Sequence, residues 1–231
     1  NWYEEKNFTF YDWLTYKTYN LKEQHLTFQS EPGITIHALL ISNAECNDSN
    51  PAYVLLHGHG GNYNDLRELA CHFAGKLHYS FLCIDSPGTI YRTKDGWGST
   101  GPDSSPENMV NIRSLGPQGS FLYHNVLAAL RGVTVLQNIP SVDNSRIGIS
   151  GASQGGVTTI IANGVESVYK RIKLAIPIVA AGNFSECIRQ ETHIIRMVPE
   201  GFNNSHPDAE LFSSYFDPLV YSPLAHAPTL V

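Results

Sequence analysis

The chain has 231 residues, enough for one sizeable domain, and its 42% of apolar and 16% of charged residues exclude a disordered protein. Its formal charge of −6 comes without a cluster of Lys and Arg, which excludes the phosphate-binding surface that nucleic acid needs. No apolar run approaches the length of a membrane span, so we expect neither a nucleic-acid partner nor a membrane-spanning segment.

The N-terminal segment, residues 1–24, begins without Met or a signal peptide and is rich in aromatic side chains. The missing Met predicts a processed or trimmed product, which slightly favours a secreted or periplasmic location. We expect the aromatic residues to pack on the domain; a wall of the substrate site is the alternative.

The next elements are two antiparallel strands, a buried strand and a helix. Residues 25–30 and 34–42 alternate around Glu-Pro-Gly, which predicts a hairpin. The apolar run 52–58 ends in glycine and is typical of a buried parallel strand. Apolar residues at helical spacing predict a helix over 64–77, with Asn64 as its N-cap.

A strand over 80–88 leads into a long loop, 88–120, which is rich in Gly, Pro, Ser and Thr. An amphipathic helix follows over 121–139. The remaining predicted elements are a strand (145–153), a helix (155–165), a strand (173–181), a long mixed insertion (183–227) and the start of a further strand (227–231).

Strands and helices alternate at the spacing of βαβ units, which predicts a mostly parallel twisted sheet with helices on both faces, in a single α/β domain over 1–231. Ligands of such sheets bind at the carboxyl ends of the strands. His57, Asp85 and Ser153 fall at those ends.

Residues Gly151-Ala152-Ser153-Gln154-Gly155 match the nucleophile-elbow pattern, in which a strained strand-to-helix turn exposes a serine Oγ at the top of a sheet. A glycine two residues to either side lets neighbouring backbone approach closely. The strand before it and the helix after it are the context that the motif requires, so Ser153 is the predicted nucleophile; a glycine-rich structural turn is the alternative.

Acyl transfer also needs hydrogen-bond donors for the developing oxyanion. The backbone N–H of Gln154 is one expected donor, and the backbone N–H of His59, in the glycine-rich loop after strand 52–58, is the other. A metal site of His57, His59 and Asp65 is a weaker alternative, because no third histidine lies in register. We expect no cofactor and no metal.

Three segments carry a resemblance to the α/β-hydrolase superfamily, in particular its branch of acetyl xylan esterases and cephalosporin deacetylases, with dienelactone-hydrolase-like and prolyl-oligopeptidase-like proteins nearby. They are "VLLHGHGG", "CIDSPG" and "YHNVLAALRGVTVLQNIPSVDNSRIGISGASQGG". The resemblance covers roughly residues 35 to 231 and implies the α/β-hydrolase fold. The esterase branch usually carries an Arg-Gly-Gln-type turn where this chain has "DSPGTIYRT".

The resemblance also implies a triad in the order Ser, acid, His. Its acid follows the strand that begins at 227–231, so the fold is expected to be cut short at the C-terminus and the acid and base to lie beyond Val231. Asp217 and His226 are weak candidates within the chain; His124 and His193 have no positional support.

The sequence thus predicts a serine hydrolase that cleaves a small-molecule carboxylic ester, an acyl or acetyl esterase, through an acyl-enzyme. A prolyl-oligopeptidase-type peptidase and a non-catalytic binding module with this fold are the alternatives. Tyr91 and Trp97, with the insertion 183–227, are expected to wall the substrate pocket. An oligomer is compatible with the sequence.

The four cysteines are widely spaced, and the sequence does not choose among their three pairings. Cys71 lies in a helical pattern and Cys83 in a strand pattern, so we expect both to be buried free thiols.

Overall fold

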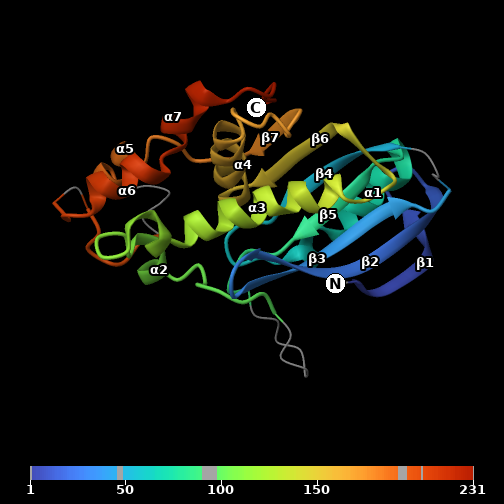
Figure 1. Ribbon diagram of the computed structural model, residues 1–231, viewed down its shortest axis with the longest axis horizontal. Coiled ribbons are helices and arrows are strands. Elements are labelled where there is room, and N and C mark those ends of the chain that lie inside the picture. The colour runs from blue at the N-terminus through green and yellow to red at the C-terminus, as the bar shows by residue number, and fades with distance from the viewer. Residues whose placement is uncertain (1, 46–48, 90–97, 192–196, 204, 231) are drawn as a thin grey trace.

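A computed structural model describes residues 2–45, 49–89, 98–191, 197–203 and 205–230. Within them, seven strands form one twisted sheet, flanked by helices (Figure 1). Their order across the sheet is β1 (Trp2–Asp12), β2 (Lys17–Glu31), β3 (Ile34–Asn43), β5 (Ser80–Ile84), β4 (Asn50–Leu56), β6 (Val142–Ala152) and β7 (Leu174–Ile178). The strands β5, β4, β6 and β7 are parallel, and β1 to β3 extend the sheet with antiparallel pairs. The predicted fold class is confirmed.

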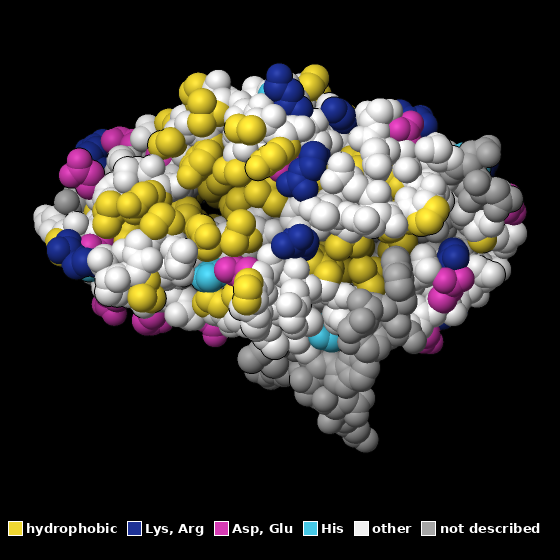
Figure 2. Space-filling view, in the orientation of Figure 1, with side chains coloured by type: hydrophobic (Ala, Val, Ile, Leu, Met, Phe, Trp, Pro, Cys, Tyr) yellow, Lys and Arg dark blue, Asp and Glu magenta, His cyan; other side chains and the backbone are white. Residues whose placement is uncertain are grey.

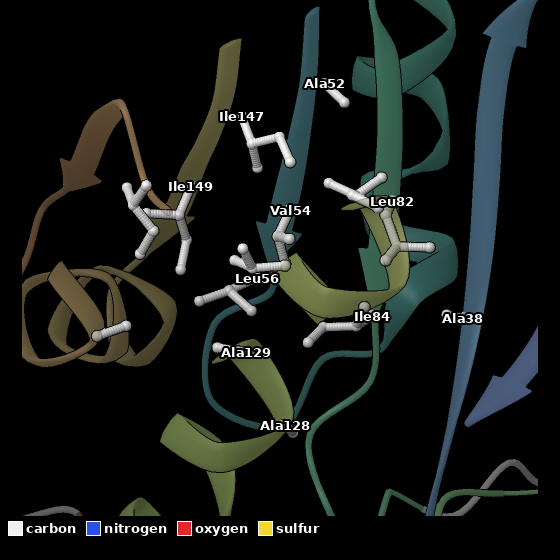
Figure 3. Packing of buried hydrophobic residues seen from close by; sticks show 14 of the residues in the cluster. Ala38, Ala52, Val54, Leu56, Leu82, Ile84, Ala128, Ala129, Ile147 and Ile149 are labelled. Carbon is white, nitrogen blue, oxygen red and sulfur yellow. The ribbon is translucent and has the colours of Figure 1, made fainter. Parts of the chain in front are cut away.

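Helices cover both faces of the sheet. Helix α1 (Arg67–Leu77) packs on one face, over the buried side chains of Leu39, Phe81 and Cys83. Helices α3 (Phe121–Gln137) and α4 (Gln154–Val165) lie on the other face. The main core lies between that face and these two helices (Figure 3); it includes Val54, Leu56, Leu82, Ala128, Ala129 and Ile149.

The N-terminal segment is part of the sheet rather than a separate layer. Strand β1 pairs with β2, and the hairpin of β2 and β3 turns at Gly33, whose φ of 83° suits glycine. Five strand spacings separate β1 from β6, about 24 Å, so β1 is not a wall of a site at Ser153.

The start of the first helix differs from the prediction. Residues Tyr63–Leu66 form a 3₁₀ turn before α1, and its N-cap is Asn62, whose side chain accepts from the backbone N–H of Asn64 at 2.9 Å. The prediction of Asn64 as the cap is therefore wrong by two residues, because the 3₁₀ turn lengthens the entry to the helix.

Both long segments that follow strands contain helices. The loop 88–120 carries α2 (Pro106–Val110) and a 3₁₀ turn (Gly116–Gly119). The insertion 183–227 carries α5 (Phe184–Arg189), α6 (Ala209–Phe216), α7 (Pro218–Tyr221) and a 3₁₀ turn (Ser222–Leu224). Their apolar side chains join those of α3 and α4 in a second core cluster that includes Phe121, Phe184 and Phe212.

The last described residues begin a further parallel strand, as the sequence predicts. The Ala175 N–H donates to Pro228 O at 3.0 Å, the Leu230 N–H donates to Ala175 O at 3.0 Å, and Ala175 and Thr229 form a parallel bridge. No helix in the described residues combines the length and the hydropathy that crossing a bilayer takes.

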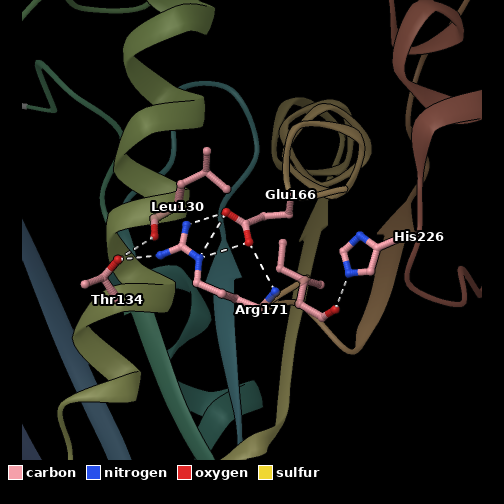
Figure 4. A network of polar contacts seen from close by, with 6 residues as sticks. Leu130, Thr134, Glu166, Arg171 and His226 are labelled. Atoms are coloured by element: carbon pink, nitrogen blue, oxygen red, sulfur yellow. Dashed lines mark hydrogen bonds and ion pairs between the residues drawn. The ribbon is translucent and has the colours of Figure 1, made fainter. Parts of the chain in front are cut away.

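Helix α4 is tied to the start of β7 by a nearly buried ion pair (Figure 4). The Arg171 Nε donates to both carboxylate oxygens of Glu166, at 2.9 and 3.1 Å, and its Nη1 donates to Thr134 Oγ1 on α3 at 2.7 Å. The Glu166 side chain is 1% exposed. The pair therefore fixes α3, α4 and β7 relative to one another at the end of the sheet away from Ser153.

Two cysteines are buried and free, as predicted. Burial raises the pKa of the Cys71 thiol to about 11 and that of the Cys83 thiol further still. Cys187 is also free and half-buried, and Cys46 lies outside the described residues.

Candidate active site

Ser153 stands between the end of β6 and the first turn of α4. Its φ of 54° and ψ of −115° are a strained conformation for a residue with a Cβ. The Ser153 N–H donates to Ile178 O at 2.8 Å, which anchors the turn to the end of β7. The predicted strand-to-helix elbow is therefore present in the geometry that the motif requires.

The glycines around Ser153 are required by close backbone packing. A Cβ on Gly151 would lie 2.6 Å from Gly155 O, and a Cβ on Gly155 would lie 2.5 Å from Leu56 O. A Cβ on Gly156 would lie 2.8 Å from Ile178 O. Contacts under 3.0 Å are shorter than real Cβ atoms make, so no larger residue fits at these positions without moving the backbone.

The loop after β4 lies beside the elbow. A Cβ on Gly58 would be 3.6 Å from Ala152 O and 3.7 Å from Ser153 Cβ, so this glycine touches the turn. Within the described part of the chain, the structure gives no hydrogen-bond acceptor for the backbone N–H of His59 or of Gln154. These are the two N–H groups that the sequence nominates as oxyanion donors.

The Gln154 side chain is buried and bridges two loops. Its Oε1 accepts from His59 Nδ1 at 3.1 Å, and its Nε2 donates to Ser86 Oγ, after β5, at 3.4 Å. The sequence nominated Gln154 only for its backbone N–H, and nothing in the motif indicated this use of its side chain.

His57 is buried at 4% exposure, and both of its ring nitrogens have partners. Its Nε2 accepts from the Ser86 N–H at 3.0 Å, so its Nδ1 carries the proton and donates to Gly58 O at 2.7 Å. Burial lowers the pKa of His57, which favours this neutral form.

The alternative of a metal site at this loop finds no support. Both ring nitrogens of His57 are occupied, and Asp65 Oδ2 accepts from the Asn62 N–H at 2.9 Å. Nowhere in the described ranges do three or more His, Cys, Asp or Glu side chains come together as metal ligands.

A largely apolar cavity of about 170 Å³ opens at Ser153. Figure 2 shows hydrophobic side chains gathered around a hollow on this face of the molecule. The residues that line the cavity are Leu122, Ser153, Gln154, Val157, Val179, Ala181, Phe184 and Met197. The insertion 183–227 thus supplies Phe184 and Met197 to the wall of this cavity. The sequence named neither residue, because a mixed sequence has no periodicity to indicate which side chains point inward.

Neither of the two weak acid–base candidates hydrogen-bonds to Ser153 among the described residues. The Asp217 carboxylate is buried and accepts from three backbone N–H groups, those of Asn183, Phe184 and Leu219. His226 Nε2 donates to Ile172 O at 2.8 Å, before the start of β7 (Figure 4). Six residues of extended chain, about 20 Å, separate that position from Ile178 beside the nucleophile. Both side chains hold the fold together.

Other nominated residues are placed as follows. His124 Nδ1 contacts Glu31 Oε1 at 2.6 Å and its Nε2 contacts Gln118 O at 2.8 Å, so both ring nitrogens have structural partners. Asp85 accepts from the Tyr63 N–H and from Ser99 Oγ, each at 2.9 Å, and holds loops together. Tyr91, Trp97 and His193 lie outside the described residues.

Comparison with known proteins agrees with this geometry. A family model for acetyl xylan esterase (AXE1) matches residues 7–197. An acetyl xylan esterase from Paenibacillus sp. R4 has the same fold, with a TM-score of 0.70 and 21% identity over 97% of this chain and 71% of that one. Acetyl xylan esterase 1 from Thermoanaerobacterium sp. JW/SL YS485 matches with a TM-score of 0.62 and 18% identity, over 98% of this chain and 71% of that one. No curated protein matches the chain.

Proposed function

The chain belongs to the acetyl xylan esterase family, which makes it a serine hydrolase of carboxylic esters, and we propose that it works through an acyl-enzyme formed on Ser153. The observation that carries this proposal is the strained elbow at Ser153, with two backbone N–H groups beside it that have no acceptor among the described residues. Such N–H groups are what a developing oxyanion needs.

In the proposed reaction, Ser153 Oγ attacks the ester carbonyl carbon and its proton passes to a base. The N–H groups of His59 and Gln154 hold the oxyanion of the tetrahedral intermediate. The bond to the alcohol oxygen then breaks, the base returns the proton to the departing alcohol, and the acyl group remains on Ser153. Water then attacks the carbonyl carbon of the acyl-enzyme, and the base takes a proton from the water. The bond to Ser153 Oγ breaks, the base returns the proton to Oγ, and the carboxylic acid is released.

The lining of the cavity supports binding of an acyl group. Its walls include the apolar side chains of Leu122, Val157 and Phe184, and an acetyl group is the acyl group after which the two similar esterases are named. We therefore propose that the substrate is an acetylated small molecule or sugar.

The base and acid are proposed to come from residues beyond Val231, as the family's triad order implies. This proposal is supported by chemistry, because a serine at its ordinary pKa needs an adjacent base. Among the described residues, no histidine or carboxylate hydrogen-bonds to Ser153 Oγ. The chain spans 71% of the length of each of the two esterases above. We also propose that residues 1–231 form part of a single α/β-hydrolase domain.

The experiment is a substrate panel on the protein expressed from its natural gene, with Ser153→Ala as the control. We expect nitrophenyl acetate to be hydrolysed faster than the butyrate and octanoate esters, and Ser153→Ala to lose this activity. Faster cleavage of a Pro-amide substrate would assign the protein to the peptidases instead. If no member of the panel is turned over, the result would favour the alternative of a non-catalytic binding module with this fold.

A further inference from the structure

His57 and the Gln154 side chain belong to a closed ring of hydrogen bonds behind the proposed oxyanion site. The ring runs from the Gln154 Nε2 to Ser86 Oγ (3.4 Å) and from the Ser86 N–H to His57 Nε2 (3.0 Å). It continues from the His57 Nδ1–H to Gly58 O (2.7 Å) and closes from the His59 Nδ1–H to Gln154 Oε1 (3.1 Å). Three loops, after β4, β5 and β6, are joined by it.

The peptide group between Gly58 and His59 connects the ring to the proposed reaction, because it carries the His59 N–H. Gly58 O and the His59 N–H belong to the same planar unit and point in opposite directions. Gly58 O accepts from His57 Nδ1 at 2.7 Å and also from the Gly61 N–H at 3.1 Å, so these two hydrogen bonds together fix the direction of the His59 N–H. They also polarise the peptide, which strengthens the N–H as a donor on its far side.

The Gln154 side chain makes the second connection. It holds the imidazole of His59 through Oε1, while its own backbone N–H is the other proposed oxyanion donor. Both donors are therefore linked by one side chain that is 1% exposed. The side chains of His57, Ser86 and Gln154 are buried, whereas His59 is exposed. The buried, satisfied part of the network has few alternative arrangements.

We propose that His57, together with the Gln154 carboxamide, is a positioning residue for the ester hydrolysis, because it aims and polarises the His59 N–H toward the oxyanion through the 58–59 peptide. The inference rests on the proposed function at Ser153. His57 touches neither the substrate nor the nucleophile in this arrangement. Its effect is felt only when negative charge develops on the carbonyl oxygen, so it should alter kcat and leave KM unchanged.

Two variants separate the two hydrogen bonds of His57. In His57→Asn, the side-chain Nδ2 takes the place of the imidazole Nδ1 and keeps the donor to Gly58 O, but the acceptor for the Ser86 N–H is lost. In His57→Gln, the Oε1 reaches the place of Nε2 and accepts from Ser86, but the donor to Gly58 O is lost. A purely structural role would make both variants equally harmful.

The experiment measures kcat and KM for nitrophenyl acetate, per active site titrated with a fluorophosphonate. We expect His57→Gln to lower kcat by about 10- to 100-fold and His57→Asn by about threefold or less, with both KM values within about twofold of the wild type. The matched control is His72→Asn. His72 lies on α1, away from the elbow, and its Nδ1 pairs with Asp12 Oδ2 at the end of β1 (2.8 Å). This control should keep the wild-type kcat.

If His57→Gln does not fold, Gln154→Met tests the same ring, because it removes both side-chain hydrogen bonds at nearly constant volume. It too should lower kcat with KM unchanged. Equal kcat losses in His57→Gln and His57→Asn, a change confined to KM, or a kcat in Gln154→Met equal to the wild type would overturn the inference. Failure of the proposed function is recognised separately: wild-type hydrolysis would then persist in Ser153→Ala or be absent altogether.

Discussion

Gly155, the second glycine of the elbow, packs so closely on Leu56 that a Cβ added to it would lie 2.5 Å from the Leu56 carbonyl oxygen and 2.8 Å from His57 O. This contact joins the first turn of α4 to the end of β4, the strand that leads into the proposed oxyanion loop. The position of Ser153 relative to that loop therefore depends on the absence of a side chain at Gly155.

We predict that Gly155→Ala lowers the esterase activity at least about 100-fold and lowers the free energy of unfolding by about 1–3 kcal/mol, because the backbone must move to admit the methyl group. The measurements are hydrolysis of nitrophenyl acetate and urea denaturation. Gly33→Ala, in the turn of the β2–β3 hairpin and outside both the elbow and the oxyanion loop, is the control for a methyl group added without a clash, because no atom lies within 4 Å of a Cβ there; its φ of 83° still makes a small loss of stability expected. Wild-type activity in Gly155→Ala would contradict the packing argument.

The ion pair of Glu166 and Arg171 is predicted to contribute to stability and not to catalysis. Removing one partner of a buried pair leaves the other charge uncompensated, so Glu166→Ala should lower the free energy of unfolding by about 3 kcal/mol. Its kcat per titrated site should match the wild type. Glu186→Ala, which breaks an exposed pair with Arg189, serves as the control and should change the denaturation midpoint little. A loss in Glu166→Ala no larger than in the control would refute this role.

Acid should destabilise the protein through Glu23. Burial alone would raise the pKa of this carboxyl, but hydrogen bonds outweigh it and lower the pKa from 4.5 to about 2; the donors are His25, Lys6 and Arg67. Because the folded-state pKa lies below the unfolded one, this stabilisation is complete above about pH 4.5 and is lost as the pH falls toward 2.

The test of this pH dependence compares the wild type with Glu23→Gln in urea denaturation from pH 7 to pH 2. At pH 7 the variant should be less stable by roughly 2–3 kcal/mol, and the difference should shrink steadily below pH 4.5. A difference that stays constant over the whole range would show that Glu23 does not titrate with folding.

The buried thiols should resist alkylation in the native protein. Burial raises the pKa of Cys71 to about 11, so little thiolate is present at pH 8, and the side chain is fully enclosed, as is that of Cys83. Iodoacetamide followed by peptide mass spectrometry should find both unmodified in buffer and both modified in guanidinium chloride, with the half-buried Cys187 reacting earlier. Rapid native-state modification of Cys83 would contradict the packing of α1 on the sheet.

The elements with strong periodicity could be predicted from the sequence. Helix α3 lies within two residues of its predicted range, and the strands at 52–58 and 173–181 are present, because each carries an apolar pattern of a length that only one element type fits. The elbow at Ser153 could be predicted because the Gly-x-Ser-x-Gly pattern lies in one short stretch, between a strand pattern and a helix pattern. The contacts that require Gly155, with Leu56 O and His57 O, are distant in the chain and became visible only in the structure.

The parts that depend on contacts across the chain could not be predicted. The ring through His57, Ser86 and Gln154 joins residues up to 97 positions apart in the sequence. No local sequence pattern indicates that these side chains lie close together. The capping by Asn62 of the 3₁₀ turn before α1 was not predicted for a different reason: Asn62 and Asn64 are both good N-cap residues, and the choice depends on where the oxyanion loop ends.

The central claim is that Ser153 is the nucleophile, and covalent labelling tests it most directly. The protein expressed from its natural gene is treated with a fluorophosphonate probe, digested, and mapped by peptide mass spectrometry. We predict one probe per chain, on the peptide that contains Ser153, loss of hydrolysis in proportion to labelling, and no labelling of Ser153→Ala. An active protein in which Ser153 stays unlabelled, or labelling that persists in Ser153→Ala, would contradict the account.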